Sequence, residues 1–280
     1  MDKKGANLIP LLDEEFNRFR KMIYSRFGIN LTDAKKSLFH TRLQKVLNGY
    51  QFETFSQYYN FLLSQKNSEA LSILVNQITT NHTHFYRESL HFDYFVNSVL
   101  PEVLKGRKGA VNLRFWSAGC SSGEEPYTLS ILLHNFFMKT STAHSAAILA
   151  TDISVKALDL AKAGIYEDSN VALLPLRLRT NYLEKYSDDL WRVTNKVRKL
   201  VRFGRFNLMR QEFPFQKKFH AIFCRNVMIY FDNRTKQKLA QKFYDAIEPG
   251  GYLFIGHSET LDRSSTPFTY VRPAVYRKGE

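Results

Sequence analysis

The sequence predicts a doubly wound α/β sheet that follows an all-helical N-terminal domain and carries a small inserted β subdomain. Three observations support this fold class. Apolar side chains in residues 11–80 recur at helical spacing, and strand-like and helix-like segments alternate after Leu113. In residues 192–205, which contain six basic side chains and no acidic one, Val193, Val197, Val201 and Phe203 recur at the even spacing of short strands. The expected divisions of the chain are 1–75, 76–280 and, for the β subdomain, about 165–206.

Four amphipathic helices are expected in the N-terminal domain. In the first, Phe16 and Phe19 lie on one apolar stripe together with Met22 and Ile23. In the second, Leu38 and Phe39 are expected to face inward with Leu43 and Val46. The second, third and fourth helices are expected at 32–47, 54–63 and 70–78.

The remainder of the chain alternates between the two kinds of segment. The expected strands lie in VNLRFWSAG, AAILATDIS, FHAIFCRNVMIYF and PGGYLFIGHSE, and FTYVRPAVYRK is expected to add an antiparallel pair. The intervening helices are expected in EEPYTLSILLHNFF, in VKALDLAKAGIY and at 233–247. Because ligands of such sheets bind at the carboxyl ends of the strands, the residues that follow each strand are the candidates for a functional site.

Composition narrows the function classes. With 40 basic and 26 acidic residues the net charge is +14, which favours an anionic partner such as nucleic acid, anionic lipid or an acidic protein. The 44% hydrophobic content excludes a disordered chain. Two cysteines are too few for a disulfide framework and indicate a reducing compartment. No signal peptide and no apolar segment of about 18 residues is found, so a cytoplasmic protein without membrane insertion is expected.

A tight turn of small residues, GCSSGEEP at 119–126, follows the first expected strand. Its backbone N–H groups and the helix that begins there suit a bound ligand. However, the G-x-G-x-x-G dinucleotide fingerprint is absent, and Glu124 and Glu125 would repel phosphate. The turn therefore favours a ligand with hydroxyls and a cationic or zwitterionic tail. The alternative is a plain strand–helix turn whose acids complement the helix dipole.

Three further segments fall at the same predicted edge or next to it. Asp152 ends the second strand, where it can accept both ribose hydroxyl protons or simply cap the next helix. CRNVMIYF (224–231) follows the third strand, and Pro-Gly-Gly (249–251) leads into the fourth. Together these segments resemble the sheet of an S-adenosylmethionine-dependent methyltransferase.

TTNHTHFYRES (79–89) lies between the expected helical domain and the expected sheet, at the position of a lid. The alternative is that its polar side chains only cap the preceding helix. His82 and His84 suggest a metal, but no third ligand follows at a suitable spacing, so no metal site is expected.

Taken in order, these segments resemble the CheR family, the chemotaxis receptor glutamate O-methyltransferases. The resemblance rests on TTNHTHFYRES, SAGCSSGEEPYTLSI, ATDIS, AKAGIY, FNL, FHAIFCRNVMIYFD and GGYLFIGHSE, and it covers nearly the whole chain. The sequence departs from the family's common STGEEPYS form at Cys120 and Ser122. Both side chains are small, so little effect is expected.

The resemblance implies methyl transfer from S-adenosylmethionine, with S-adenosylhomocysteine as product, to glutamate side chains on the cytoplasmic helices of chemoreceptors. It implies a set of site residues: Asn81, Thr83 and Arg87 at the methionine end or the mouth of the site, Glu125 at the methionine amino group, Asp152 at the ribose, Asn207 and Leu208 at the adenine, Arg225 and Asn226 in the pocket, and Tyr230 near the transferred methyl.

The implied reaction suits these residue types. A glutamate carboxylate is ionised at neutral pH and needs no general base, so alignment of the reactants can supply most of the catalysis. Arg87 is expected to orient that carboxylate or to bind the cofactor carboxylate. Tyr230 offers a hydroxyl and a ring face to the sulfonium, or is a core aromatic after a strand. These two are the candidate catalytic residues.

Receptor contacts are expected at two places. Lys35, Arg42 and Lys45 fall within about an 80° arc of the second helix and could dock an acidic receptor helix, or form a solvated face. In some members of the family the β subdomain binds a receptor C-terminal peptide by strand addition; a basic edge that opposes aggregation is the alternative. The chain is expected to be a monomer.

Two other functions were weighed against this one. A nucleic-acid methyltransferase fits the charge, but the surroundings of Cys224, Phe-Cys-Arg, and the lack of a Pro-Pro motif speak against it, so no nucleic-acid partner is expected. A non-catalytic module that binds S-adenosylmethionine is opposed by the complete series of candidate residues.

Overall fold

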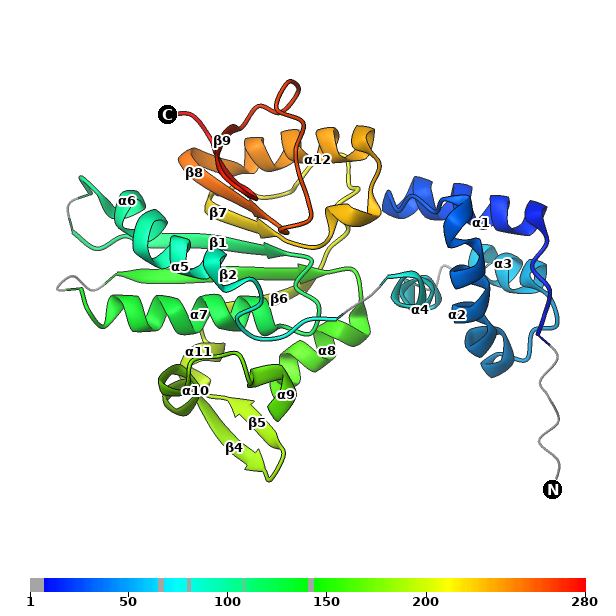
Figure 1. Ribbon diagram of the computed structural model, residues 1–280, viewed down its shortest axis with the longest axis horizontal. Coiled ribbons are helices and arrows are strands. Elements are labelled where there is room, and N and C mark those ends of the chain that lie inside the picture. Colours follow the sequence, from blue (N-terminus) through cyan, green and yellow to red (C-terminus); the bar gives the residue numbers. More distant parts are fainter. Residues whose placement is uncertain (1–7, 65–67, 80–81, 108, 141–143) are drawn as a thin grey trace. The chain divides into compact units, whose positions relative to one another are not determined.

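A computed structural model of the protein describes residues 8–64, 68–79, 82–107, 109–140 and 144–280. The chain divides into two compact units, residues 1–80 and 81–280 (Figure 1). The boundary expected at residue 75 lies inside helix α4 (Ser68–Ile78), whereas the first unit extends to residue 80. Each unit is described by itself below.

The first unit is all-helical, as the sequence predicted. Its elements besides α4 are α1 (Asp13–Phe27), η1 (Asp33–Lys35), α2 (Lys36–Gly49) and α3 (Phe55–Ser64). Helix α1 starts with three acidic residues, which complement the helix dipole, and ends at Gly28 in the left-handed conformation (φ 69°). Aromatic side chains form much of its core: Phe16, Phe19, Phe39, Phe55 and Tyr58 are all buried.

Helix α2 differs from the prediction in two respects. It begins at Lys36, because residues 33–35 form the separate turn η1. Leu38, which was expected to face inward, is 48% exposed. Phe39 and Leu43 define the buried stripe, and Leu38 precedes Phe39 by one residue, which turns it by about 100° away from the stripe.

The second unit contains a seven-stranded sheet in the order β6-β2-β1-β7-β8-β10-β9. Strands β6, β2, β1, β7 and β8 run parallel, and β10 and β9 add an antiparallel edge. Their bounds are β1 (Asn112–Ala118), β2 (Ser145–Asp152), β6 (Val201–Arg205), β7 (Phe219–Cys224), β8 (Ile247–Ile255), β9 (Thr269–Arg272) and β10 (Val275–Arg277). The predicted doubly wound sheet is confirmed. The strand order reverses between β1 and β7, and ligands of such sheets bind at the carboxyl ends of the strands at this point of reversal.

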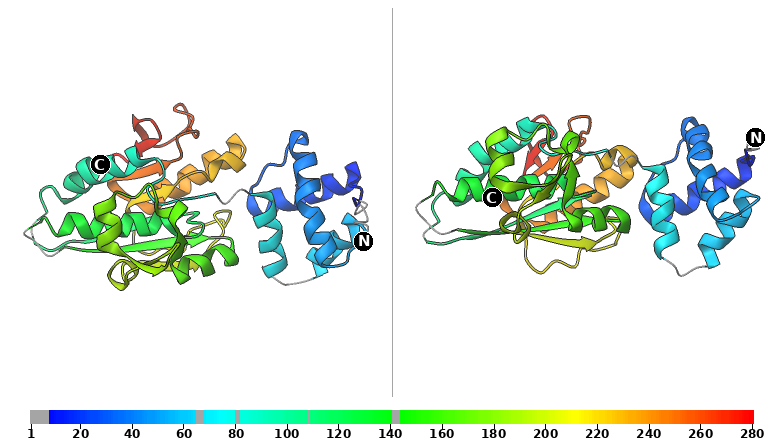
Figure 2. Two further views of the ribbon diagram at one scale, coloured as in Figure 1. Left: turned by 60° about the horizontal axis from the view of Figure 1, so that its bottom comes forward. Right: turned by 90° about the horizontal axis from the view of Figure 1, so that it is seen from below.

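Helices cover both faces of the sheet (Figures 1 and 2). Side chains alternate along β1, so that Phe115 packs on one face and Trp116 on the other. The Phe115 face is covered by α5 (Ser89–Tyr94), η2 (Phe95–Val99), α6 (Leu100–Leu104), α7 (Glu124–Phe137) and α8 (Val155–Ala163). The Trp116 face is covered by α12 (Asn233–Ala246).

Trp116 is the centre of the second face. It is fully buried, and its indole N–H donates to the Thr151 hydroxyl oxygen at 2.8 Å. Five phenylalanine rings lie within 5.7 Å of it, centroid to centroid: Phe206, Phe213, Phe215, Phe219 and Phe243.

A small antiparallel sheet, in the order β3-β5-β4, forms the inserted subdomain. It consists of β3 (Ile165–Glu167), β4 (Leu183–Ser187) and β5 (Leu190–Val193), with helices α9 (Asp168–Val171) and α10 (Leu176–Tyr182) between the first two strands. The basic segment 192–205 does not stay in this sheet. It continues through α11 (Asn195–Arg198) into β6, which pairs with β2 because Val201 is buried in the core of the large sheet.

Among the described residues, none of the helices combines the length and the apolar character that a membrane span requires.

Candidate active site

Unusual backbone conformations concentrate where the strands of the large sheet end. In the described part of the chain, six residues other than glycine have a positive φ, and four of them lie here: Tyr86 (61°), Glu88 (57°), Ser121 (48°) and Asn226 (59°). Such conformations persist where the surrounding contacts enforce them, and they cluster at functional sites. This edge of the sheet is therefore the candidate functional site.

The turn after β1 requires glycine. At Gly119 φ is 91°, and a Cβ there would lie 2.4 Å from Val227 Cγ2. The N–H groups of Gly119 and Cys120 both donate to the Thr151 carbonyl, at 2.8 and 2.9 Å. The turn is thereby fixed to the end of β2, with no space for a larger residue at its first position.

Asp152 is held at the tip of β2 by backbone donors. One carboxylate oxygen accepts the Ser121 N–H at 2.8 Å, and the other accepts the Ser154 N–H at 2.9 Å. Burial raises the pKa of Asp152, although these N–H donors act in the opposite direction. Helix α8 is capped by the hydroxyl of Ser154, which accepts the Ala157 N–H at 3.0 Å. The capping role considered for Asp152 thus belongs to Ser154.

A buried guanidinium joins two carboxylates beside this turn. The Arg225 side chain is 2% exposed and follows β7. Its Nη1 donates to Glu125 Oε2 at 2.9 Å, and its Nη2 donates to Glu88 Oε2 at 3.1 Å and to the Arg87 carbonyl. The other oxygen of Glu125 accepts the Ser117 hydroxyl at 2.7 Å. Two negative charges therefore share one positive charge in a nearly dry environment.

Glu88 is the second carboxylate of this network, and it contacts the loops that follow β7 and β8. Besides Arg225 it accepts the Asn226 side-chain amide at 3.2 Å and the His257 N–H at 3.2 Å. Burial acts to raise the pKa of Glu88, but the Arg225 guanidinium and the Asn226 amide outweigh it, and the pKa lies below its ordinary value.

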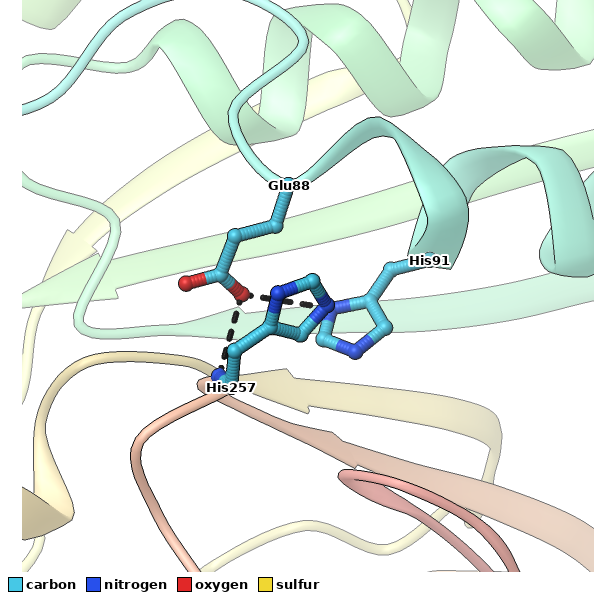
Figure 3. Close-up of side chains that lie close together, drawn as sticks. All are labelled: Glu88, His91 and His257. Atoms are coloured by element: carbon cyan, nitrogen blue, oxygen red, sulfur yellow. Dashed lines mark hydrogen bonds and ion pairs between the residues drawn. The ribbon is translucent and has the colours of Figure 1, made fainter.

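Two imidazole rings lie against this carboxylate (Figure 3). His91 Nδ1 lies 3.4 Å from Glu88 Oε2, and the His91 ring makes an edge contact with the His257 ring at 4.4 Å. His91 is buried, whereas His257 is exposed. Burial, and then the neighbouring Arg225 charge, lower the pKa of His91 to about 3, so its ring is neutral at physiological pH.

Glu259 fixes the loop that follows β7. Its carboxylate accepts three backbone N–H groups: Asn226 at 3.0 Å, Ile229 at 2.9 Å and Gly256 at 2.5 Å. Burial raises the pKa of Glu259, while these donors oppose the shift. The loop ends in η3 (Met228–Tyr230), so this carboxylate orders the backbone around both Asn226 and the half-buried Tyr230.

The segment that precedes α5 carries Thr83 and Arg87, both half-buried. Arg87 Nη1 donates to the His82 carbonyl at 2.7 Å. Asn170 belongs to the inserted subdomain. Its backbone carbonyl accepts the Phe85 N–H at 2.9 Å, and its side-chain amide donates to the Thr83 carbonyl at 3.4 Å. Asn81, the remaining expected residue here, lies outside the described residues.

Asn207 and Leu208 follow β6. The Asn207 side-chain oxygen accepts the Met209 N–H at 2.9 Å, which orders the turn. Leu208 is half-buried against the core of the Trp116 face, and its carbonyl accepts the Lys242 ammonium at 2.5 Å. Both residues follow a strand end at the same edge as Asp152.

The three basic residues expected to bind a receptor lie in the helical unit. Lys35 ends η1, and Arg42 and Lys45 belong to α2. Arg42 Nη1 donates to the carbonyls of Gln77 and Thr79, at 3.2 and 3.4 Å, so its guanidinium is tied to the end of α4. Lys45 is exposed.

The structure therefore links Glu125, Arg225 and Asn226 through hydrogen bonds that involve Glu88. Asp152 is held separately, by the turn after β1 and by the start of α8. Sequence reasoning missed Glu88, Glu259 and Ser117. Glu88 and Glu259 lie in the motifs TTNHTHFYRES and GHSE, which were recognised without any role being given to their acids. An acid directly after the candidate Arg87 was the available signal for Glu88.

Unsatisfied polar atoms indicate what this site can hold. Ser121 Oγ and Arg225 Nε are buried and have no hydrogen-bond partner among the described residues. Buried polar atoms are normally paired, so a ligand is expected to complete them. The carboxylates of Glu125 and Asp152 are hydrogen-bond acceptors, as a ligand with an ammonium group and hydroxyls requires. The site therefore fits a polar, partly cationic ligand.

Both units of the chain match models of the same protein family. Residues 81–276 match the family model described as CheR methyltransferase, SAM binding domain, and residues 14–79 match CheR methyltransferase, all-alpha domain. The chain is 43% identical to a chemotaxis protein methyltransferase of Borreliella burgdorferi, with 96% of each chain covered. It is 37% identical to a probable chemotaxis protein methyltransferase of Rhizobium etli (86% of this chain, 90% of that one) and 34% identical to the chemotaxis protein methyltransferase of Escherichia coli K12 (96% and 92%).

Proposed function

The chain belongs to the CheR methyltransferase family, and from that premise we propose that it transfers the methyl group of S-adenosylmethionine to glutamate side chains of chemoreceptors, forming methyl esters. The observation that supports this most directly is the strand-tip site, where Glu125 and Asp152 lie beside two unpartnered buried polar atoms. That donor set fits S-adenosylmethionine, which carries an ammonium group, a carboxylate and ribose hydroxyls.

In this proposal each expected residue has one task toward the cofactor. Glu125 accepts the ammonium group, and Asp152 accepts the ribose hydroxyls. Asn207 and Leu208 flank the adenine. Arg225 and Asn226 line the pocket. Asn81 and Thr83 belong to the mouth of the site, together with Arg87.

The chemistry needs few protein groups. When bound, S-adenosylmethionine supplies a methyl carbon attached to a positively charged sulfur. The acceptor glutamate is already ionised, so the protein has no proton to remove. Arg87 orients the acceptor carboxylate, and Tyr230 presents its ring and hydroxyl to the positive charge. The rigid loop around Tyr230, held by Glu259, keeps this arrangement in place, so that alignment provides the catalysis.

The helical unit is proposed to dock the substrate. Receptor methylation regions rich in glutamate are acidic, and the basic surface formed by Lys35, Arg42 and Lys45 is complementary to them. Arg42 is already fixed by the carbonyls at the end of α4, whereas Lys45 presents its charge at the surface.

The direct test is transfer of a tritiated methyl group to membranes that contain the cognate receptor. Base-labile label on the receptor is expected, because methyl esters hydrolyse in base, and the label should disappear when the methylated glutamates are replaced. Label on RNA or DNA would overturn the proposal. Binding of S-adenosylhomocysteine in a calorimeter without any turnover would instead indicate a non-catalytic module.

Two substitutions test the assigned catalytic roles. Tyr230→Phe and Arg87→Ala are each expected to lower kcat/KM by about a hundredfold, since each removes a group proposed to contact the reacting atoms. Circular dichroism and the melting temperature should stay near those of the wild type. Wild-type turnover in both variants would contradict the roles.

A further inference from the structure

We propose that Glu88 is a positioning residue of the methyl-transfer site, whose carboxylate holds Arg225 and Asn226 in the arrangement that binds the cofactor. This inference rests on the proposed function and adds to it. Glu88 is not assigned to contact the cofactor or the acceptor. Its role is to act through the two residues that it holds.

The contacts of Glu88 come from three separate parts of the α/β unit. Glu88 is the residue before α5, its side-chain partners Arg225 and Asn226 follow β7, and its backbone partner His257 follows β8. Its side chain is 15% exposed and its backbone is left-handed, which places the carboxylate between these loops. One side chain thus joins the start of α5 to the two loops that follow β7 and β8.

The charges explain how Glu88 would affect cofactor binding. Arg225 divides its two terminal amino groups between Glu88 and Glu125, at 3.1 and 2.9 Å. Glu125 therefore keeps part of its negative charge available for an ammonium group. Without the Glu88 carboxylate, the buried guanidinium would be neutralised by Glu125 alone, because an unpaired buried charge is costly. Glu125 would then bind the ammonium group less well.

A metal site is the other interpretation of these residues. Ligand atoms of Glu88, His91 and His257 lie within 4.8 Å of one another (Figure 3), and neither ring nitrogen of His91 has a hydrogen-bond partner in the described chain. Ligands of tetrahedral zinc, at bond lengths of about 2.0–2.1 Å, lie closer together, roughly 3.3 Å apart. Moreover, Arg225 already places a positive charge at 3.1 Å from the same carboxylate oxygen. Both facts favour the positioning role.

The test compares Glu88→Gln and Glu88→Asp with a matched control, Glu248→Gln. Glu248 also forms an ion pair with an arginine, Arg114 at 3.0 Å, but at the first strand positions of the same sheet, far along the strands from the site. Calorimetry would measure the Kd for S-adenosylhomocysteine, and receptor methylation would give KM for the cofactor and kcat.

We expect Glu88→Gln to raise Kd and KM about tenfold and to leave kcat within about twofold, because a charge-assisted contact that organises cofactor binding is lost. Glu88→Asp keeps the charge but is too short for all its partners, so it should lie between this variant and the wild type. Glu248→Gln should match the wild type. If Glu88→Gln does not fold, Glu88→Asp decides the question.

Three results would overturn the inference. The first is a wild-type Kd for S-adenosylhomocysteine in Glu88→Asp and in folded Glu88→Gln. The second is a loss of kcat at unchanged KM in these variants. The third is stoichiometric binding of Zn²⁺ to the wild-type protein, if His91→Gln abolishes this binding and if the bound Zn²⁺ alters the Kd for S-adenosylhomocysteine. Failure of the proposed function looks different. In that case the wild-type protein would methylate no receptor, whatever the Glu88 variants bind.

Discussion

In the helical unit the ion pairs lie at the surface, whereas in the α/β unit the central ion pairs are buried. Arg20 pairs with Asp33 and Lys36 pairs with Asp13, and both carboxylate side chains are 87% exposed. Arg225 instead pairs with Glu88 and Glu125 while only 2% exposed. Surface pairs contribute little to stability and respond to salt, whereas a buried charge must keep its partner. The same residue types therefore form exposed, salt-sensitive pairs in one unit and a buried pair of fixed geometry in the other.

The largest effect is expected from removing the shared cation. Arg225→Met leaves Glu88 and Glu125 without their buried partner, so the free energy of unfolding should fall by about 3–5 kcal/mol. Binding of S-adenosylhomocysteine should be lost at the same time. Arg20→Met, the surface counterpart, should change stability by less than about 1 kcal/mol. Urea denaturation of both variants would measure the difference, and equal losses would break the comparison.

Glycine substitutions compare how tightly the backbone is packed in the two units. Gly119→Ala places a Cβ 2.4 Å from Val227 at a φ of 91°, so we expect it to destabilise the protein by about 2 kcal/mol. Gly49→Ala, at the end of α2, meets no atom within 4 Å and should be neutral or stabilising by up to about 1 kcal/mol. Thermal denaturation would compare them. A tolerated Gly119→Ala would show that the turn after β1 is less constrained than described.

Acid should weaken the α/β unit through His91. Above pH 6.5 its ring is neutral in the folded and unfolded states, but below 6.5 only the unfolded chain takes up the proton, because the folded pKa is about 3. The free energy of unfolding should therefore fall by about 1 kcal/mol between pH 7 and pH 5.5. Denaturant titrations at both pH values would measure this, and His91→Gln should reduce the slope. An unchanged slope in that variant would assign the effect to another group.

The smallest effect is expected on the basic helix surface. Lys45→Glu should raise KM for the receptor about threefold at low salt, because it reverses a charge proposed to face an acidic helix. Charge reversal at Arg42 should act in the same direction. Lys21→Glu, an exposed basic position in α1, is the matched control. In methylation assays at increasing salt, the rise in KM caused by Lys45→Glu should become smaller, whereas the loss of cofactor binding in Arg225→Met should persist. A salt-independent Lys45 effect would remove the distinction between the two units.

The fold was predictable because alternation and helical spacing are local properties of the sequence. Segments such as VNLRFWSAG and the helix at 124–137 follow directly from such patterns. The assignment of β6 to the large sheet did not follow, since the even spacing of Val201 and Phe203 is typical of a strand but does not identify its partner.

Site residues were most predictable where a side chain ends a strand or directly follows one. Asp152 ends β2 and Arg225 follows β7, and their place at one sheet edge follows from parallel pairing. Glu88 does neither. It reaches Arg225 across 137 positions of the chain and from a left-handed backbone, and neither property is visible in the residues around it.

The enclosure of Trp116 has a practical consequence. The chain contains two tryptophans, and the other, Trp191, is half-buried on the small sheet beside Lys185. Trp116 is surrounded by phenylalanine rings, so its fluorescence emission should be at short wavelength. In a Trp191→Phe protein the emission would come from Trp116 alone. Trp116 directly precedes Ser117, whose hydroxyl donates to Glu125. We expect a ligand at the strand tips to change this emission, which would report occupancy of the site without a label.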